Sequence, residues 1–105
     1  MKVAYISGPY RAETINGIVQ NIRNAEKVAI KYWQMGYAVI CPHKNTALFD
    51  GVAPDHIWLE GDLEFITRLI PGHDVLVLIK GWKKSEGAHL ERNCAIKNGI
   101  QLIYD

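Results

Sequence analysis

Four short apolar runs separated by three helical segments constrain the fold of this chain more than any other feature. The runs cover residues 2–7, 37–41, 74–79 and 100–104. They are almost continuously apolar, which is typical of parallel strands buried on both faces of a sheet. The intervening segments, over residues 15–33, 55–70 and 86–97, have apolar residues at helical spacing or good helix boundaries. Residues 43–55 are predicted to form a long loop.

The order of these elements predicts one α/β domain over residues 1–105, with a four-stranded parallel sheet covered by helices on both faces. Right-handed crossovers give a three-layer Rossmann-like (flavodoxin-like) fold, most simply with strand order 2-1-3-4. Ligands of such folds bind at the carboxyl ends of the strands. The loops after Ser7, Cys41 and Ile79 are therefore the expected location of the functional site.

The overall composition limits the class of partner. With 12 basic and 11 acidic residues in 105, the chain lacks the excess of positive charge that binding to a nucleic acid polymer or a membrane surface requires. Cys41 and Cys94 form no metal-binding or disulfide pattern, and we expect a cytoplasmic protein without a leader or membrane span. The four histidines are scattered, so neither a metal site nor a cofactor is expected, and the dinucleotide-binding glycine pattern is missing.

Glu91 is the first candidate catalytic residue. It lies in a helical stripe of small or weakly polar residues, namely Gly87, Ala88, Cys94, Ala95 and Asn98. A carboxylate on such a face loses hydration, which raises its pKa and suits a nucleophile. The alternative is a glutamate at the edge of the stripe that reaches water.

Other polar residues near the predicted strand ends have two interpretations. Tyr5 either belongs to the core or faces the cleft, and Asp62 is either a solvated helix residue or part of the site. Ser85 is a natural N-cap for the helix that follows it, and such a helix start can also hold a phosphate. Ser7, Gly8 and Arg11 follow the first strand and are expected beside the cleft, and His43 is carried by the predicted long loop.

Four segments together resemble the nucleoside 2-deoxyribosyltransferase superfamily, and within it the 2'-deoxynucleoside 5'-monophosphate N-hydrolases and small phage and bacterial relatives of unassigned function. The segments are YISGPYR at the first strand, DLEFI in the second helix, DVLVLI, and SEGAHLERNCA. In the last one, Ser85, Gly87, Glu91 and Ala95 match the spacing of the superfamily motif.

The resemblance implies a role for each matching residue. Glu91 corresponds to a nucleophilic glutamate, Tyr5 to a tyrosine that orients it, and Asp62 to an aspartate that assists the leaving base or the sugar. Ser85 corresponds to a serine that binds the 5'-phosphate. The remaining expected substrate-binding residues are Ser7, Gly8, Arg11, His43, Gly87 and His89.

Two residues depart from the superfamily motif. His89 replaces a residue that is usually small, and Glu86 places a negative charge beside the expected phosphate site. Both departures favour a nucleoside or another ribosyl donor over a monophosphate.

The resemblance also implies a mechanism and an assembly. The glutamate attacks C1' as the base departs, and water or another base then resolves the glycosyl-enzyme. Asp62 or a loop histidine would supply the proton to the base. Members of the superfamily form homodimers or higher oligomers in which a neighbouring subunit closes the site.

Two other functional classes remain open from sequence alone. The first is a nucleotide-binding module that holds its ligand at the same strand ends without chemistry. The second is an interaction protein that keeps the fold and has lost the activity. Retention of Tyr5, Asp62 and Glu91 together favours the enzyme.

Overall fold

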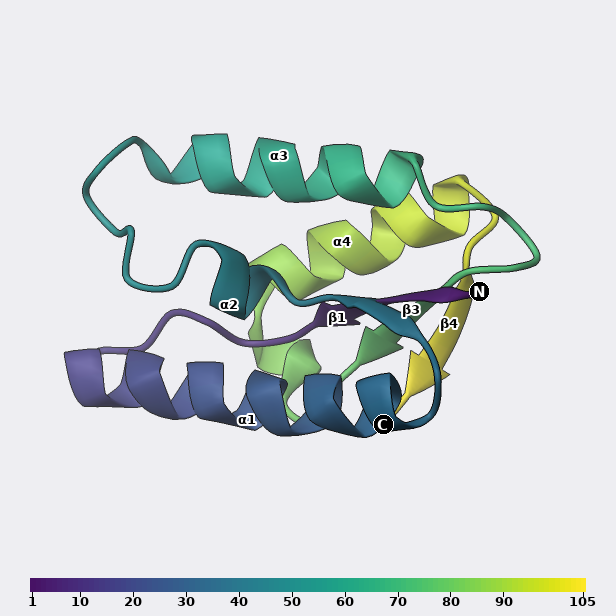
Figure 1. Ribbon diagram of the computed structural model, residues 1–105. Coiled ribbons are helices and arrows are strands. Elements are labelled where there is room, and N and C mark those ends of the chain that lie inside the picture. The colour runs from purple at the N-terminus through teal and green to yellow at the C-terminus, as the bar shows by residue number, and fades with distance from the viewer.

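A four-stranded parallel sheet with the order β2-β1-β3-β4 forms the centre of the computed structural model, which describes residues 1–105 (Figure 1). The strands are β1 (Val3–Ser7), β2 (Ala38–Ile40), β3 (Val75–Leu78) and β4 (Gln101–Tyr104). The predicted three-layer α/β architecture and the predicted strand order are both confirmed.

Helices cover both faces of this sheet. Helix α1 (Ile15–Gln34) lies along one face, whereas α3 (Asp55–Thr67) and α4 (Glu86–Lys97) lie on the other (Figure 1). The Thr14 side chain caps α1 by accepting a hydrogen bond from the Gly17 amide at 3.0 Å. After α1 the chain turns at Gly36, whose φ of 93° favours glycine. None of the helices has the length and apolar content that crossing a bilayer requires.

Alternate residues of each central strand point to opposite faces, which places two apolar clusters on the two sides of the sheet. In β1, Ala4 and Ile6 pack toward α1, and Tyr5 packs in the other cluster with residues of α3 and α4. In β3, Val77 belongs to the first cluster and Leu76 to the second. Burial on both faces explains why these strands are almost continuously apolar.

Two predicted boundaries differ from the structure. The segment predicted as a loop from residue 43 to residue 55 begins with a short helix, α2 (Pro42–Asn45), because Pro42 both ends the strand and is favourable at the start of a helix. Helix α3 ends at Thr67 and not near Ile70. The Ile70 amide donates instead to Asp74 Oδ2 at 2.7 Å, and the Val3 amide donates to Asp74 Oδ1 at 2.8 Å.

Candidate active site

A cleft of about 600 Å³ opens at the carboxyl ends of the strands, where the fold predicts a ligand site. It lies between the β1–α1 loop, α2 and the loop after it, α3, and the start of α4. Most of the predicted site residues line it: Gly8, Arg11, His43, Asp62, Ser85, Gly87 and Glu91.

Glu91 is fixed in the wall of this cleft by two hydroxyl groups from β1. Its side chain is only 7% exposed and lies on the buried face of α4, as the small residues around it predict. Tyr5 Oη donates a hydrogen bond to Oε2, and Ser7 Oγ donates to Oε1 at 2.7 Å. Because Tyr5 and Ser7 are two residues apart in a strand, both side chains point to the same face of the sheet. Of the two interpretations of Tyr5, the structure shows the first: its side chain is fully buried in the core and does not line the cleft, although its hydroxyl group bonds Glu91, which does.

Ser7 belongs to the site in a different role from the expected one. It was expected to border the substrate, but its side chain is fully buried and bonds the carboxylate. Its role in the structure is therefore to orient Glu91, together with Tyr5. The pattern of alternating residues in β1 carries this information, but only once the strand's two faces are known.

The environment of Glu91 disfavours its charged form. Burial raises its pKa to about 7, the hydrogen bonds from Tyr5 and Ser7 oppose the shift, and the charge of Asp62 adds to it. Burial and the Glu91 carboxylate also raise the pKa of Tyr5 well above its ordinary value. The Tyr5 hydroxyl therefore keeps its proton and remains a hydrogen-bond donor to Glu91.

Asp62 faces the same cleft from α3. It is half-buried, and burial raises its pKa to about 6, with no hydrogen bond or neighbouring charge to offset the loss of hydration. A carboxyl group with this pKa can hold a proton near neutral pH and give it to a leaving group. Asp62 and Glu91 thus form a pair of carboxyl groups on adjacent helices, both with raised pKa values.

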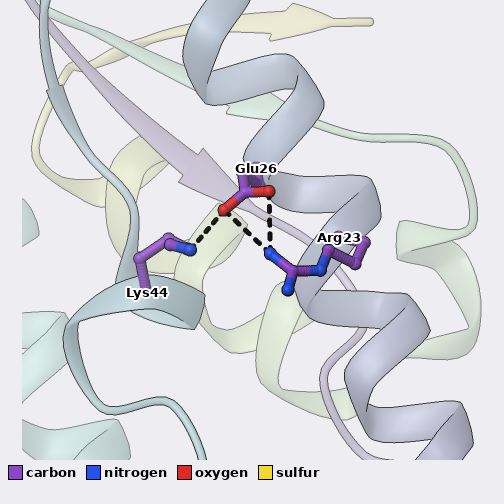
Figure 2. Close-up of polar contacts among 3 residues, drawn as sticks. All are labelled: Arg23, Glu26 and Lys44. Carbon is purple, nitrogen blue, oxygen red and sulfur yellow. Dashed lines mark hydrogen bonds and ion pairs between the residues drawn. The ribbon is translucent and has the colours of Figure 1, made fainter.

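His43 is positioned by α2, which an ion pair ties to α1, and by a hydrogen bond to the loop after β1. Lys44 of α2 forms an ion pair with Glu26 of α1, which also binds Arg23 with Nη1 to Oε1 at 3.0 Å (Figure 2). His43 Nε2 lies 2.8 Å from the Pro9 carbonyl, so this nitrogen carries the proton and donates.

Burial also lowers the pKa of His43, which favours the neutral ring. Its Nδ1 is then an acceptor, and it has no partner in the protein. Because the only proton of the neutral His43 ring is on Nε2 and is bonded to the Pro9 carbonyl, Asp62 is the better candidate acid.

Three polar contacts join the loop after β1 to the segment between α2 and α3 and to the start of α3. Arg11 Nη2 lies 2.6 Å from Asp55 Oδ1 at the start of α3. Tyr10 Oη donates to Asp50 and accepts from the Leu48 amide at 3.0 Å. Sequence analysis did not identify Asp50 or Asp55 as cleft residues, because acidic residues in a loop carry no spacing signal that points to a site.

The start of α4 borders the cleft at Ser85 and Gly87, whereas His89 lies elsewhere. Ser85 Oγ accepts a hydrogen bond from the Ala88 amide at 3.1 Å, so the predicted N-cap is present. The structure does not bring His89 to the cleft: its Nε2 lies 2.8 Å from the Lys83 carbonyl, and its ring is 5.0 Å from that of Trp82. At about 200° around the helix from both Gly87 and Glu91, it lies on a different face.

Replacing Ser85 tests its role as a cap separately from any role toward a ligand. We expect Ser85→Ala to lower the free energy of unfolding by about 1 kcal/mol, because the Ala88 amide loses its acceptor. Ser85→Asp, which retains a capping oxygen, should lose less. Urea denaturation of the three proteins measures this, and equal midpoints for Ser85→Ala and the wild type would contradict it.

The fold and the cleft define an α/β domain of Rossmann-like architecture whose ligand site contains a buried glutamate oriented by a tyrosine and a serine. The chain belongs to the family described as "Domain of unknown function (DUF4406)", whose model matches residues 1–104. A search of the curated proteins found no match. The description of the family states no activity.

Proposed function

We propose that this protein cleaves or exchanges the N-glycosidic bond of a nucleoside or nucleotide, with Glu91 as the nucleophile. The observation that carries the proposal is the environment of this carboxylate. It is buried, oriented by hydrogen bonds from Tyr5 and Ser7, and placed in the wall of a cleft of about 600 Å³. The resemblance of four segments to the nucleoside 2-deoxyribosyltransferase superfamily supports the same chemistry.

The arrangement suits a two-step displacement with retention at C1'. In the first step, the bond between C1' and the base nitrogen breaks as a Glu91 oxygen bonds C1', and Asp62 gives its proton to the departing base. In the second step, water or another base attacks C1', the bond to Glu91 breaks, and Asp62 takes up the released proton. The hydrogen bonds from Tyr5 and Ser7 hold the carboxylate in one orientation. A nucleophile held in this way reacts faster because less orientational freedom is lost on the way to the transition state.

The remaining cleft residues have supporting roles in this proposal. Gly8, Arg11, Ser85 and Gly87 border the sugar and any group on its 5' position. His43 lines the cleft, but its unpaired Nδ1 is buried, so in this proposal the ring shapes the wall of the cleft and does not hydrogen-bond the substrate.

A homodimer or higher oligomer belongs to the same proposal. A second groove beside the edge strand β2 is lined by Ile30, Trp33 and Phe65, all of which are substantially exposed. Apolar side chains of this size on one surface are typical of an interface. Sedimentation velocity measures the oligomeric state, and a monomer at all concentrations would contradict this part of the proposal.

The direct test is a chromatographic screen for free base. The purified protein is incubated with ribo- and 2'-deoxyribonucleosides and their 5'-monophosphates, with and without an added acceptor base. Release of base, or its exchange in the presence of the acceptor, supports the proposal. Saturable binding of these compounds without release or exchange would instead identify a binding module.

The two raised pKa values predict a bell-shaped dependence of kcat/KM on pH. Attack requires ionised Glu91, with a pKa of about 7, and protonation of the base requires protonated Asp62, with a pKa of about 6. Activity should therefore peak between about pH 6 and pH 7, with limbs that belong to the coupled pair.

Asp62→Asn separates the two limbs. It should remove the alkaline limb and leave only the limb of Glu91, whose pKa should fall below about 7 because the charge of Asp62 no longer raises it. Initial rates from about pH 5 to about pH 9 measure both effects. An alkaline limb that persists in Asp62→Asn would show that another group is the acid.

A further inference from the structure

The cleft contains more negative than positive side chains. Two permanent cations line it, Arg11 and Lys84. Arg11 is already paired with Asp55 at 2.6 Å. Against these two stand five carboxyl groups: Asp50, Asp55, Asp62, Glu86 and Glu91. A cleft with this balance attracts neutral or positively charged ligands and repels anions.

Glu86 occupies the position where an anionic ligand would gain most. The first amides of a helix have no acceptor within the helix and form a natural anion site. At the start of α4, Ser85 Oγ already accepts from the Ala88 amide, and Glu86 places its own carboxylate in the first turn. This charge interacts favourably with the helix dipole. An anionic ligand bound at these amides would be repelled by the Glu86 carboxylate.

We propose that the cleft selects uncharged nucleosides against their 5'-phosphates, and that Glu86 is a specificity-determining residue. The inference rests on the proposed nucleoside chemistry of the site. A 5'-phosphate carries a charge of about −1.5 to −2 at neutral pH. Bound in this cleft it would meet Glu86 and Asp50 with Lys84 as the only cation that has no ion-pair partner. Like charges placed against an unwanted ligand are a general means of specificity.

Binding measured in the absence of turnover tests this selectivity. In the Glu91→Gln background, dissociation constants are determined by calorimetry for four 2'-deoxynucleosides and their 5'-monophosphates. The same constants are determined after adding Glu86→Gln, or Glu60→Gln as a control. Glu60 is an exposed residue of α3 outside the cleft, so its substitution changes the net charge equally.

We expect at least one nucleoside to bind about tenfold more tightly than its monophosphate. Glu86→Gln should reduce that ratio about threefold or more by tightening monophosphate binding, and Glu60→Gln should leave it unchanged. Added salt should also reduce it, because salt screens the repulsion.

The outcomes separate the selectivity from the proposed catalysis. Tighter binding of monophosphates, equal binding of both classes, or binding of neither would overturn the selectivity. So would equal effects of Glu86→Gln and Glu60→Gln. Selective binding of nucleosides by a protein that releases or exchanges no base would leave the selectivity standing and would refute the catalytic proposal.

Discussion

Glu91→Gln should lower the rate of base release by at least about 10³-fold, the scale on which loss of a nucleophile acts. Glutamine keeps the shape of the side chain. Its Oε1 can still accept from one of the two hydroxyl groups of Tyr5 and Ser7, and its Nε2 can donate to the other. Its amide oxygen is, however, too weak a nucleophile to form the glycosyl-enzyme. Initial rates on the substrate found in the screen measure the effect. Glu60→Gln, outside the cleft, is the matched control and should keep full activity.

Glu91→Gln should abolish activity but stabilise the fold, so thermal unfolding distinguishes an inactive folded variant from one that fails to fold. The pKa of Glu91 is raised in the folded protein, so ionisation of this group costs stability as pH rises from about 4.5 to about 7. Glutamine removes that cost. Glu91→Gln should therefore unfold at a higher temperature than the wild type at about pH 8, with a smaller difference at about pH 4.5. A fully active variant would exclude Glu91 as the nucleophile.

Gly8→Ala should destabilise the protein by about 1–3 kcal/mol, although it adds a single methyl group. A Cβ at this position would lie 2.2 Å from Ile79 Cγ1 and 2.6 Å from Ile79 Cδ1. Ile79 is only 3% exposed and packs in the cluster beneath α1, so it cannot turn into solvent. Either the loop after β1, which borders the cleft, or the end of β3 must move.

A matched control and a double mutant make this prediction specific. Gly61→Ala adds a methyl group on the surface of α3, where nothing lies within 4 Å, and should be neutral or stabilising. If the contact with Ile79 is the cause, Ile79→Ala should cost less stability in the Gly8→Ala protein than in the wild type. Urea denaturation of the set provides all the values. Equal midpoints for Gly8→Ala and the wild type would contradict the steric argument.

The sequence predicted the sheet because its strands carry a strong local signal. The run Val75–Leu78 is apolar at every position and Val3–Ser7 at all but the last, and this pattern is typical of burial on both faces. The N-cap at Ser85 was equally predictable from sequence, since capping depends on residues close together in the chain. The short helix α2 was missed because four residues are too few to show helical periodicity.

The site was only partly predictable, because its contacts join distant parts of the chain. The stripe around Glu91 identified the residue, but its two hydrogen bonds reach back to Tyr5 and Ser7, more than 80 positions earlier. The half-burial of Asp62 depends on how α3 packs against α4. His89, by contrast, was predicted to bind substrate only because it lies within the motif, and in the structure it lies on another face of α4.

The Asp74 carboxylate makes the stability of the fold depend on pH in the acid range. Burial acts to raise its pKa, but hydrogen bonds from the Ile70 and Val3 amides and the contact with His73 outweigh burial, and the pKa is lowered. Asp74 therefore stabilises the fold above the ordinary pKa of an aspartate and loses this effect as pH falls through its lower folded value.

Glu91 acts in the opposite sense at the other end of the sheet, where ionisation of the buried group weakens the fold as pH approaches about 7. As far as these two carboxyl groups decide it, the free energy of unfolding is therefore largest at mildly acidic pH, since it falls below that range through Asp74 and above it through Glu91. Ionisation of Glu91 destabilises the end of the domain that holds the cleft, whereas protonation of Asp74 in strong acid weakens the contacts at the end where β1 begins.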